Sequence, residues 1–154
     1  MRADLDQSSI INASSQFWDQ MLAMRLEPME IPDEFCVGPG HIRATVVLSG
    51  AWAGSIELRL AERLAYEATA AMLMQTIDTV AEADALDATK EIANMIAGVI
   101  KSSLPRPCNM TVPQSQVRSD GFCSPQRTES SLVVAFRHVS GDVMVCVHEV
   151  AQVR

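Results

Sequence analysis

Two pairs of apolar segments, each pair joined by a glycine-containing turn, constrain the fold of this chain more than any other feature. Residues 55–60 alternate apolar with polar side chains, the pattern of a half-buried strand, and residues 41–49 before them are rich in β-branched residues. Near the end of the chain, residues 131–139 and 142–150 repeat this arrangement around a Ser-Gly pair, whose glycine can supply a positive φ. The sequence therefore predicts two β-hairpins.

Three further segments have the composition or spacing of helices. Apolar side chains recur at helical intervals over residues 8–26, until a proline stops the pattern. Residues 61–74 contain neither Gly nor Pro and are rich in Ala, Leu and Met, and a third helix is expected over residues 84–103. Residues 108–117 are interpreted as one irregular strand. With the hairpins, these elements predict a single α+β domain over residues 1–154, with a mainly antiparallel sheet packed against helices.

The charge of the chain excludes several classes of partner. The formal net charge is −7, whereas proteins that bind nucleic acid or acidic membrane surfaces present clustered Lys and Arg. Residues 1–6 carry acids where a signal peptide needs a basic start, and no stretch approaches the roughly 18 consecutive apolar residues of a membrane span. We therefore expect a cytoplasmic protein that binds neither nucleic acid nor a membrane.

The cysteines and histidines form no metal or redox motif. The four cysteines include no close pair such as C-x-x-C, so that they are expected to be reduced, mostly structural thiols: Cys36, Cys108, Cys123 and Cys146. The three histidines fall in predicted strands without a suitably spaced ligand partner, and no metal is assigned to them: His41, His138 and His148.

The third predicted helix carries the candidate chemistry. At about 100° per residue, Asp87, Glu91, Asn94 and Gly98 fall within one narrow stripe of its surface. Gly98 is unusual there, because a glycine inside a helix costs about 1 kcal/mol relative to Ala. A missing side chain would let another molecule approach closely, which favours a docking surface. The apolar residues of the opposite side are expected in the core: Ile92, Ile96, Val99 and Ile100.

The run Asp87-x-x-x-Glu91-x-x-Asn94 resembles the signature of the CheC/CheX/FliY chemotaxis phosphatases, and residues 95–98 are similar to what commonly follows it. The order of predicted elements also agrees with that family. Only one copy of the signature is present, so the resemblance favours the single-site CheX branch. One departure is the distal proline: Pro113 follows Asn94 sooner than the family pattern usually places it.

The resemblance implies a CheC/CheX-like α/β sandwich with the signature helix exposed, and a homodimer. It implies a hydrolase in chemotaxis or related two-component signalling, acting on the aspartyl phosphate of a CheY-like response regulator. Glu91 and Asn94 would be the catalytic residues, and Asp87, Gly98 and Lys101 would contact the partner. No cofactor of its own is implied, because the Mg²⁺ ion would belong to the phosphorylated regulator.

Two alternatives remain open from the sequence. The first is a noncatalytic module of the same fold, which would bind a receiver domain or a flagellar switch component without accelerating hydrolysis. The second is a small-molecule sensing domain, which would require a sizeable apolar pocket with convergent polar groups. No linear motif in the sequence marks such a pocket.

Overall fold

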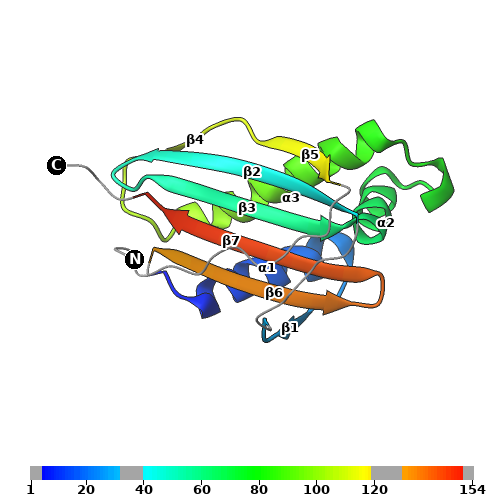
Figure 1. Cartoon of the computed structure of the whole chain (residues 1–154), viewed down its shortest axis with the longest axis horizontal. Coiled ribbons are helices and arrows are strands. Elements are labelled where there is room, and N and C mark those ends of the chain that lie inside the picture. The colour runs from blue at the N-terminus through cyan, green and yellow to red at the C-terminus, as the bar shows by residue number, and fades with distance from the viewer. Residues whose placement is uncertain (1–4, 32–39, 119–129, 151–154) are drawn as a thin grey trace.

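The computed structural model describes residues 5–31, 40–118 and 130–150 of the chain. Within them, a seven-stranded antiparallel sheet packs against three α-helices, two of which lie behind the sheet and one at its right-hand end in the view of Figure 1. This arrangement is the expected α+β class. In chain order the elements are α1 (Gln7–Leu22), β1 (Glu27–Met29), β2 (His41–Gly50), β3 (Gly54–Ala61), α2 (Glu62–Leu73), the 3₁₀ turn η1 (Ile77–Thr79), α3 (Glu82–Lys101), β4 (Cys108–Met110), β5 (Gln114–Arg118), β6 (Ser131–His138) and β7 (Gly141–Glu149).

Both predicted hairpins are present and form the centre of the sheet. The strand order is β1-β6-β7-β3-β2-β4, and β5 also pairs with β2. β2 pairs with β3 and β6 with β7, each antiparallel, while β3 and β7 join the two hairpins side by side. Gly141 begins β7 with a φ of 142°, the positive value that the turn requires. The hairpin at the end of the chain therefore completes the sheet begun near its start.

The hydrophobic core lies between the sheet and the helices. Alternate residues of β3 point toward the helices, and the side chains of Ile56, Leu58 and Leu60 are fully buried there. Trp18 of α1 is buried against the same core. Because the period-two pattern of β3 places one face inward, it also fixes which residues lie on the opposite face.

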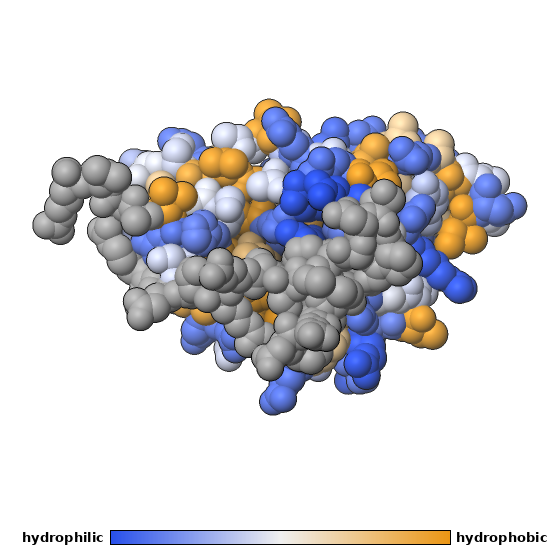
Figure 2. Space-filling model, viewed as in Figure 1, coloured by the Kyte–Doolittle hydropathy of each residue, from blue (hydrophilic) through white to orange (hydrophobic). Residues whose placement is uncertain are grey.

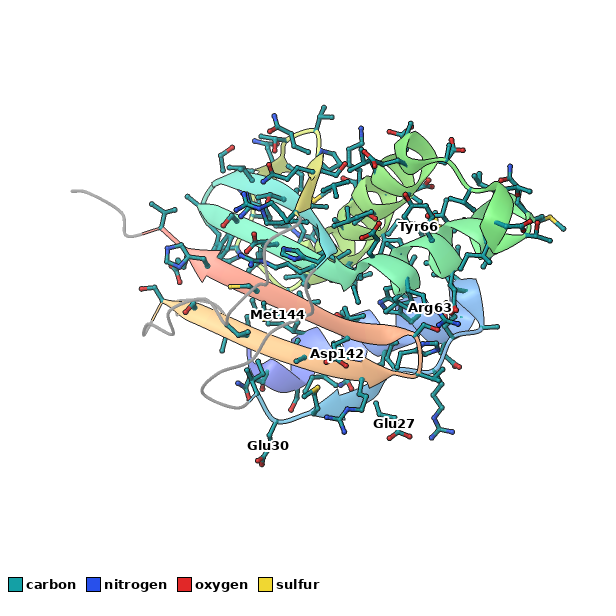
Figure 3. The ribbon with its side chains drawn as sticks, turned by 45° about the vertical axis from the view of Figure 1, so that its right-hand side comes forward. Glu27, Glu30, Arg63, Tyr66, Asp142 and Met144 are labelled. Atoms are coloured by element: carbon teal, nitrogen blue, oxygen red, sulfur yellow. The ribbon has the colours of Figure 1, made fainter. Side chains whose placement is uncertain are left out.

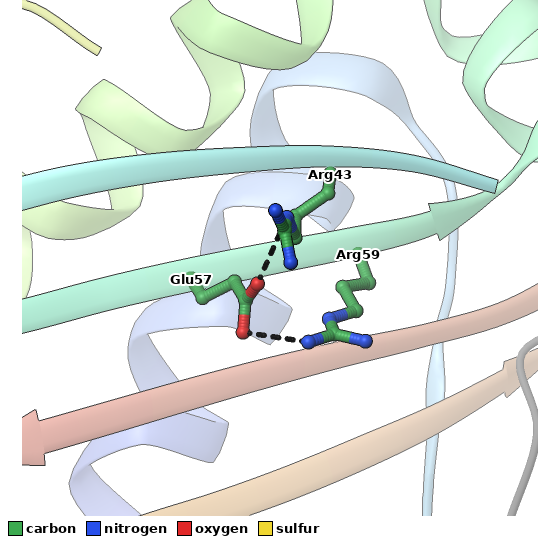
Figure 4. Close-up of polar contacts among 3 residues, drawn as sticks. All are labelled: Arg43, Glu57 and Arg59. Atoms are coloured by element: carbon green, nitrogen blue, oxygen red, sulfur yellow. Dashed lines mark hydrogen bonds and ion pairs between the residues drawn. The ribbon is translucent and has the colours of Figure 1, made fainter. Parts of the chain in front are cut away.

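On that opposite face, β2 and β3 carry a compact charged cluster (Figure 4). Arg43 and Arg59 lie directly opposite each other in the register, so that their like charges are adjacent. Glu57 contacts both: its Oε1 lies 3.3 Å from Nε of Arg43 and its Oε2 lies 3.1 Å from Nη2 of Arg59. Burial lowers the pKa of Arg59, and the hydrogen bond and charge of Glu57 oppose that change. One carboxylate thus holds two facing arginines together.

The N-terminal helix is shorter than expected, and the strand that follows it was missed. α1 ends at Leu22 because Ala23 adopts the left-handed conformation and its N–H donates to Asp19 and Trp18. The chain then forms β1, which pairs with residues 135–137 of β6. Figure 3 shows Glu27 and Glu30 at this edge, pointing away from the sheet. The proline in β1 was interpreted only as the end of the preceding helix, but an edge strand also tolerates proline.

Two other expectations need correction. Val99 was expected in the core, but 48% of it is exposed, because it lies at the margin of the buried stripe beside the exposed Asn12 and Gln16 of α1. The single irregular strand at residues 108–117 is in fact two strands, β4 and β5, which pair with different parts of β2. Among the described residues, no helix combines the length and apolarity needed to cross a membrane.

Candidate functional site

The helix α3 is held firmly by its buried side. It packs against β2, α2 and α1. The charges at its ends also interact favourably with the helix dipole, because Glu82 and Asp84 lie in the first turn and Lys101 lies in the last. The hydroxyl of Ser102 donates to the carbonyl of Val99 at 2.6 Å and satisfies one group at the end of the helix. A stripe of eight buried residues anchors it: Ala85, Ala88, Thr89, Ile92, Ala93, Ile96, Ala97 and Ile100. The opposite side is therefore presented on a fixed support.

The two predicted catalytic residues lie on the accessible side of this helix. Glu91 is exposed, and Asn94, one turn later, is half-buried. Within the described part of the chain, neither side chain has a hydrogen-bond or ion-pair partner. Asp87 is exposed too and forms an ion pair with Lys90, with Oδ1 and Nζ 3.1 Å apart. The carboxylate of Glu91 and the amide of Asn94 are thus free to engage another molecule.

Gly98 and Lys101 continue the same stripe toward the end of the helix. A Cβ atom placed on Gly98 would meet nothing within 4 Å, so this position is open rather than packed against the protein's own backbone. Gly98 and Lys101 line a hollow of about 430 Å³, together with Arg106. Arg106 was not among the residues predicted from the sequence. Its only signal was its place between Pro105 and Pro107, which turn the chain back beside the helix.

On the other flank of the stripe lies a larger groove, of about 580 Å³, between α1, α2 and α3. The side chains of Asp87 and Glu91 line it, so it adjoins the candidate catalytic residues directly. We call it the methionine groove, because four methionines are among its apolar lining residues: Phe17, Met21, Leu22, Met72, Leu73, Met74 and Met95. No linear motif marks this groove, because three separate helices form it.

The histidines and cysteines that the structure describes do not assemble into a metal site. Among residues 5–31, 40–118 and 130–150, no group of three or more His, Cys, Asp or Glu side chains could hold a metal ion. His41 is buried and His148 exposed, and Nδ1 of His138 accepts from the backbone N–H of Ser140 at 3.0 Å.

The two cysteines that the structure describes are free and buried, and two fall outside its described residues. Cys108 and Cys146 are the buried pair, whereas Cys36 and Cys123 lie outside. Burial, followed by the charge of Glu57, raises the pKa of the Cys146 thiol to about 11. This thiol is protonated at neutral pH, which suits the structural role expected for it.

Known proteins share this architecture over almost the whole chain. A CheC-like superfamily protein from Shewanella sp. PV-4 has a TM-score of 0.75 and 16% identity, over 94% of this chain and 96% of that one. The chemotaxis protein CheX of Desulfovibrio desulfuricans gives 0.71 and 20%, over 92% and 97%. A CheX from Borrelia burgdorferi, crystallised in a complex with CheY, BeF3 and Mg²⁺, gives 0.70 and 17%, over 92% and 96%. These similarities establish the fold.

The sequence itself identifies the family. No match to this chain was found among curated proteins. The family model described as chemotaxis phosphatase CheX, however, matches residues 42–137, a span that includes all but the first residue of β2 and the whole of β3 and α3. Because this match covers more than half of the 154 residues, the chain belongs to the CheX family of chemotaxis phosphatases.

Proposed function

We propose that this protein removes the phosphoryl group from the aspartyl phosphate of a CheY-like response regulator. The observation that carries the proposal is the accessibility of Glu91 and Asn94 on a helix whose other side is buried. Membership of the CheX family supports it, as does the fold similarity to a CheX that was crystallised with CheY. The activity needs a second protein, because the phosphoryl group belongs to the regulator.

In this reaction the chain needs only to position the attacking water and the regulator. The regulator supplies the aspartyl phosphate and a Mg²⁺ ion, and a water molecule attacks phosphorus while the bond from phosphorus to the aspartyl oxygen breaks. The products are a free aspartate and inorganic phosphate. The side-chain amide of Asn94, which has both donor and acceptor atoms, orients the water in line with the breaking bond. No nucleophile from this chain is required.

Glu91 holds the regulator in register. Its carboxylate, one helical turn before Asn94, pairs with a lysine beside the phosphorylated aspartate of the regulator. Asp87, Gly98 and Lys101 then contact the surrounding surface of the regulator. Gly98 lets that surface approach the helix, since there is open space where a side chain would be. The hollow beside it offers the cations of Lys101 and Arg106 to the acidic pocket of the regulator.

The decisive experiment measures phosphoryl loss from individual receiver domains encoded by the same genome. Each domain is phosphorylated with acetyl phosphate and mixed with wild-type protein, Asn94→Ala or Asn12→Ala. Asn12 is the control, because it is also an asparagine on a helix but lies on α1, where it is exposed. We expect Asn94→Ala to slow hydrolysis about a hundredfold, or about 2.7 kcal/mol, and Asn12→Ala to match the wild type.

Two outcomes would contradict the proposal. Equal rates for wild type and Asn94→Ala would remove the role of the amide. A receiver domain that binds tightly but loses phosphate at its spontaneous rate would instead identify a noncatalytic module.

We also propose that the protein acts as a homodimer. Exposed strand edges must be covered or paired, and in the described part of the sheet β1 covers only residues 135–137 of β6. Light scattering at low protein concentration checks the oligomeric state, and a monomeric mass would refute the dimer.

A further inference from the structure

The methionine groove combines unusual exposure with apolar character. Met74 is 94% exposed, Met21 is 59% exposed and Leu73 is 45% exposed, although all three are large apolar residues lining one groove. Figure 2 shows hydrophobic residues reaching the surface at the end of the molecule where α2 lies in Figure 1. Exposed apolar residues that gather around one groove, rather than being scattered singly, mark a surface that binds something.

The backbone conformation of Met74 also indicates that the groove is a binding surface. Met74 has a φ of 55° and ends α2, a left-handed position where glycine would be free of strain. Here a long apolar side chain stands at that position and projects almost entirely into solvent. Neither packing within the described structure nor backbone preference accounts for a methionine at this place. A contact with a partner would account for it, since methionine adapts readily to an apolar surface.

One side of the groove is acidic. Asp84, Asp87 and Glu91 line it, and all three come from α3. In the described part of the chain only Asp87 has a cationic neighbour, the Lys90 on its own helix. An occupant that fits both features must present an apolar stripe to the methionines and basic side chains to α3. An amphipathic helix with a basic edge has that pattern.

We propose that the methionine groove docks a basic-edged amphipathic helix of the response regulator. This inference rests on the proposed function, and Glu91 links the two, because it belongs both to the groove and to the catalytic stripe. A regulator seated over Glu91 and Asn94 necessarily lies beside the groove. Docking there adds apolar contact area next to the site of chemistry and selects among regulators by the sequence of one helix.

Charge argues against a second copy of this chain as the occupant. A two-fold symmetric contact through this face would set the three carboxylates of one copy against the same three of the other. The chain as a whole carries a net charge of −7, so both partners would be acidic. A different protein with a basic edge avoids this repulsion, and its basic side chains are attracted to the three carboxylates.

The test uses direct binding, so that it does not depend on catalysis. Receiver domains encoded by the same genome are activated with beryllofluoride and Mg²⁺, and their Kd for the full-length protein is measured by biolayer interferometry. The groove variants are Met21→Glu and Met74→Glu, both at exposed positions where the fold tolerates a charge, and Asp84→Lys for the acidic side. The matched control is Val47→Glu, which adds the same charge at a position that is 47% exposed on the face of the sheet opposite the helices.

We expect each groove variant to raise the Kd about tenfold or more, because a carboxylate in an apolar contact is desolvated and a lysine on the acidic side repels the basic edge. Val47→Glu should keep the wild-type Kd. Circular dichroism confirms that every variant is folded. Unchanged binding in all three groove variants would overturn the docking site while leaving the phosphatase proposal intact.

The remaining outcomes are also decisive. Groove-dependent binding without any acceleration of phosphoryl loss would sustain the docking site and defeat the phosphatase proposal. Wild-type protein that binds no receiver domain would overturn both. A wild-type dimer that becomes a monomer in Met74→Glu would show that a second copy fills the groove, which refutes the regulator as its occupant.

Discussion

Ala23 and Met74 hold the same left-handed backbone conformation at the ends of α1 and α2, with φ values of 51° and 55°. Each conformation costs a residue with a Cβ atom about 1 kcal/mol relative to glycine. Only Met74 lines the methionine groove. Comparing the two positions therefore separates the effect of the left-handed backbone on stability from the role of the Met74 side chain in binding.

We predict that Ala23→Gly and Met74→Gly each raise the free energy of unfolding by about 1 kcal/mol, because both relieve the same strain. Met74→Gly loses little packing, since its side chain is 94% exposed. Urea denaturation measures the stability, and binding of the activated receiver domain measures the function. Only Met74→Gly should weaken binding. Equal binding by the two variants would show that the methionine side chain is dispensable.

Two substitutions at Gly98 should affect stability and dephosphorylation differently. We predict that Gly98→Ala raises the free energy of unfolding by about 0.5–1 kcal/mol, because alanine favours a helix and its Cβ meets no atom within 4 Å. Gly98→Trp should fold as well, yet slow dephosphorylation by blocking the regulator's approach. The control is Val47→Trp, at an exposed position on the face of the sheet opposite the helices. Full activity of Gly98→Trp would remove Gly98 from the docking surface.

The sequence predicted the parts of the fold that depend on local patterns. The hairpins β2–β3 and β6–β7 follow from alternation and turn glycines, and the three helices follow from composition and spacing. The strand β1 was not predictable, because its three residues include a proline and are stabilised by pairing with β6, far away in the chain. Pairing partners of this kind leave no mark in a local window.

The same distinction applies to the candidate site. Helical periodicity was enough to place Asp87, Glu91 and Asn94 on one side of α3, because they belong to a single helix. It was not enough for Val99, whose exposure depends on where α1 stops covering the helix. The methionine groove and the hollow containing Arg106 need several segments to come together. Such features appear only in three dimensions.

The charged cluster on the outer face of the sheet predicts a stability effect. Glu57→Ala should lower the free energy of unfolding by about 1–3 kcal/mol, because it leaves Arg43 and Arg59 facing each other without their shared carboxylate. Glu30→Ala is the control, since Glu30 is exposed at the edge of the sheet, and should change stability by less than about 0.5 kcal/mol. Indistinguishable denaturation curves would mean that the cluster contributes nothing.

Cys146 predicts how stability responds to alkaline pH. Its pKa is raised from the ordinary 9.0 to about 11, mainly by burial and further by the charge of Glu57. The folded state therefore keeps a proton that the unfolded state loses. The resulting stabilisation is fully present below pH 9 and disappears as the pH rises through 11. Between about pH 8 and 10, this group alone should remove about 1 kcal/mol of stability.

Comparing variants isolates that contribution from other groups that titrate in the same range. Cys146→Ala should lose less stability than the wild type between the two pH values, because it has no thiol to ionise. Val133→Ala is the control: Val133 lies directly opposite Cys146 on β6 and also leaves a cavity, but it removes no titrating group. Its pH dependence should match the wild type. Parallel pH profiles for wild type and Cys146→Ala would show that the thiol ionises equally in both states, contrary to its burial beside Glu57.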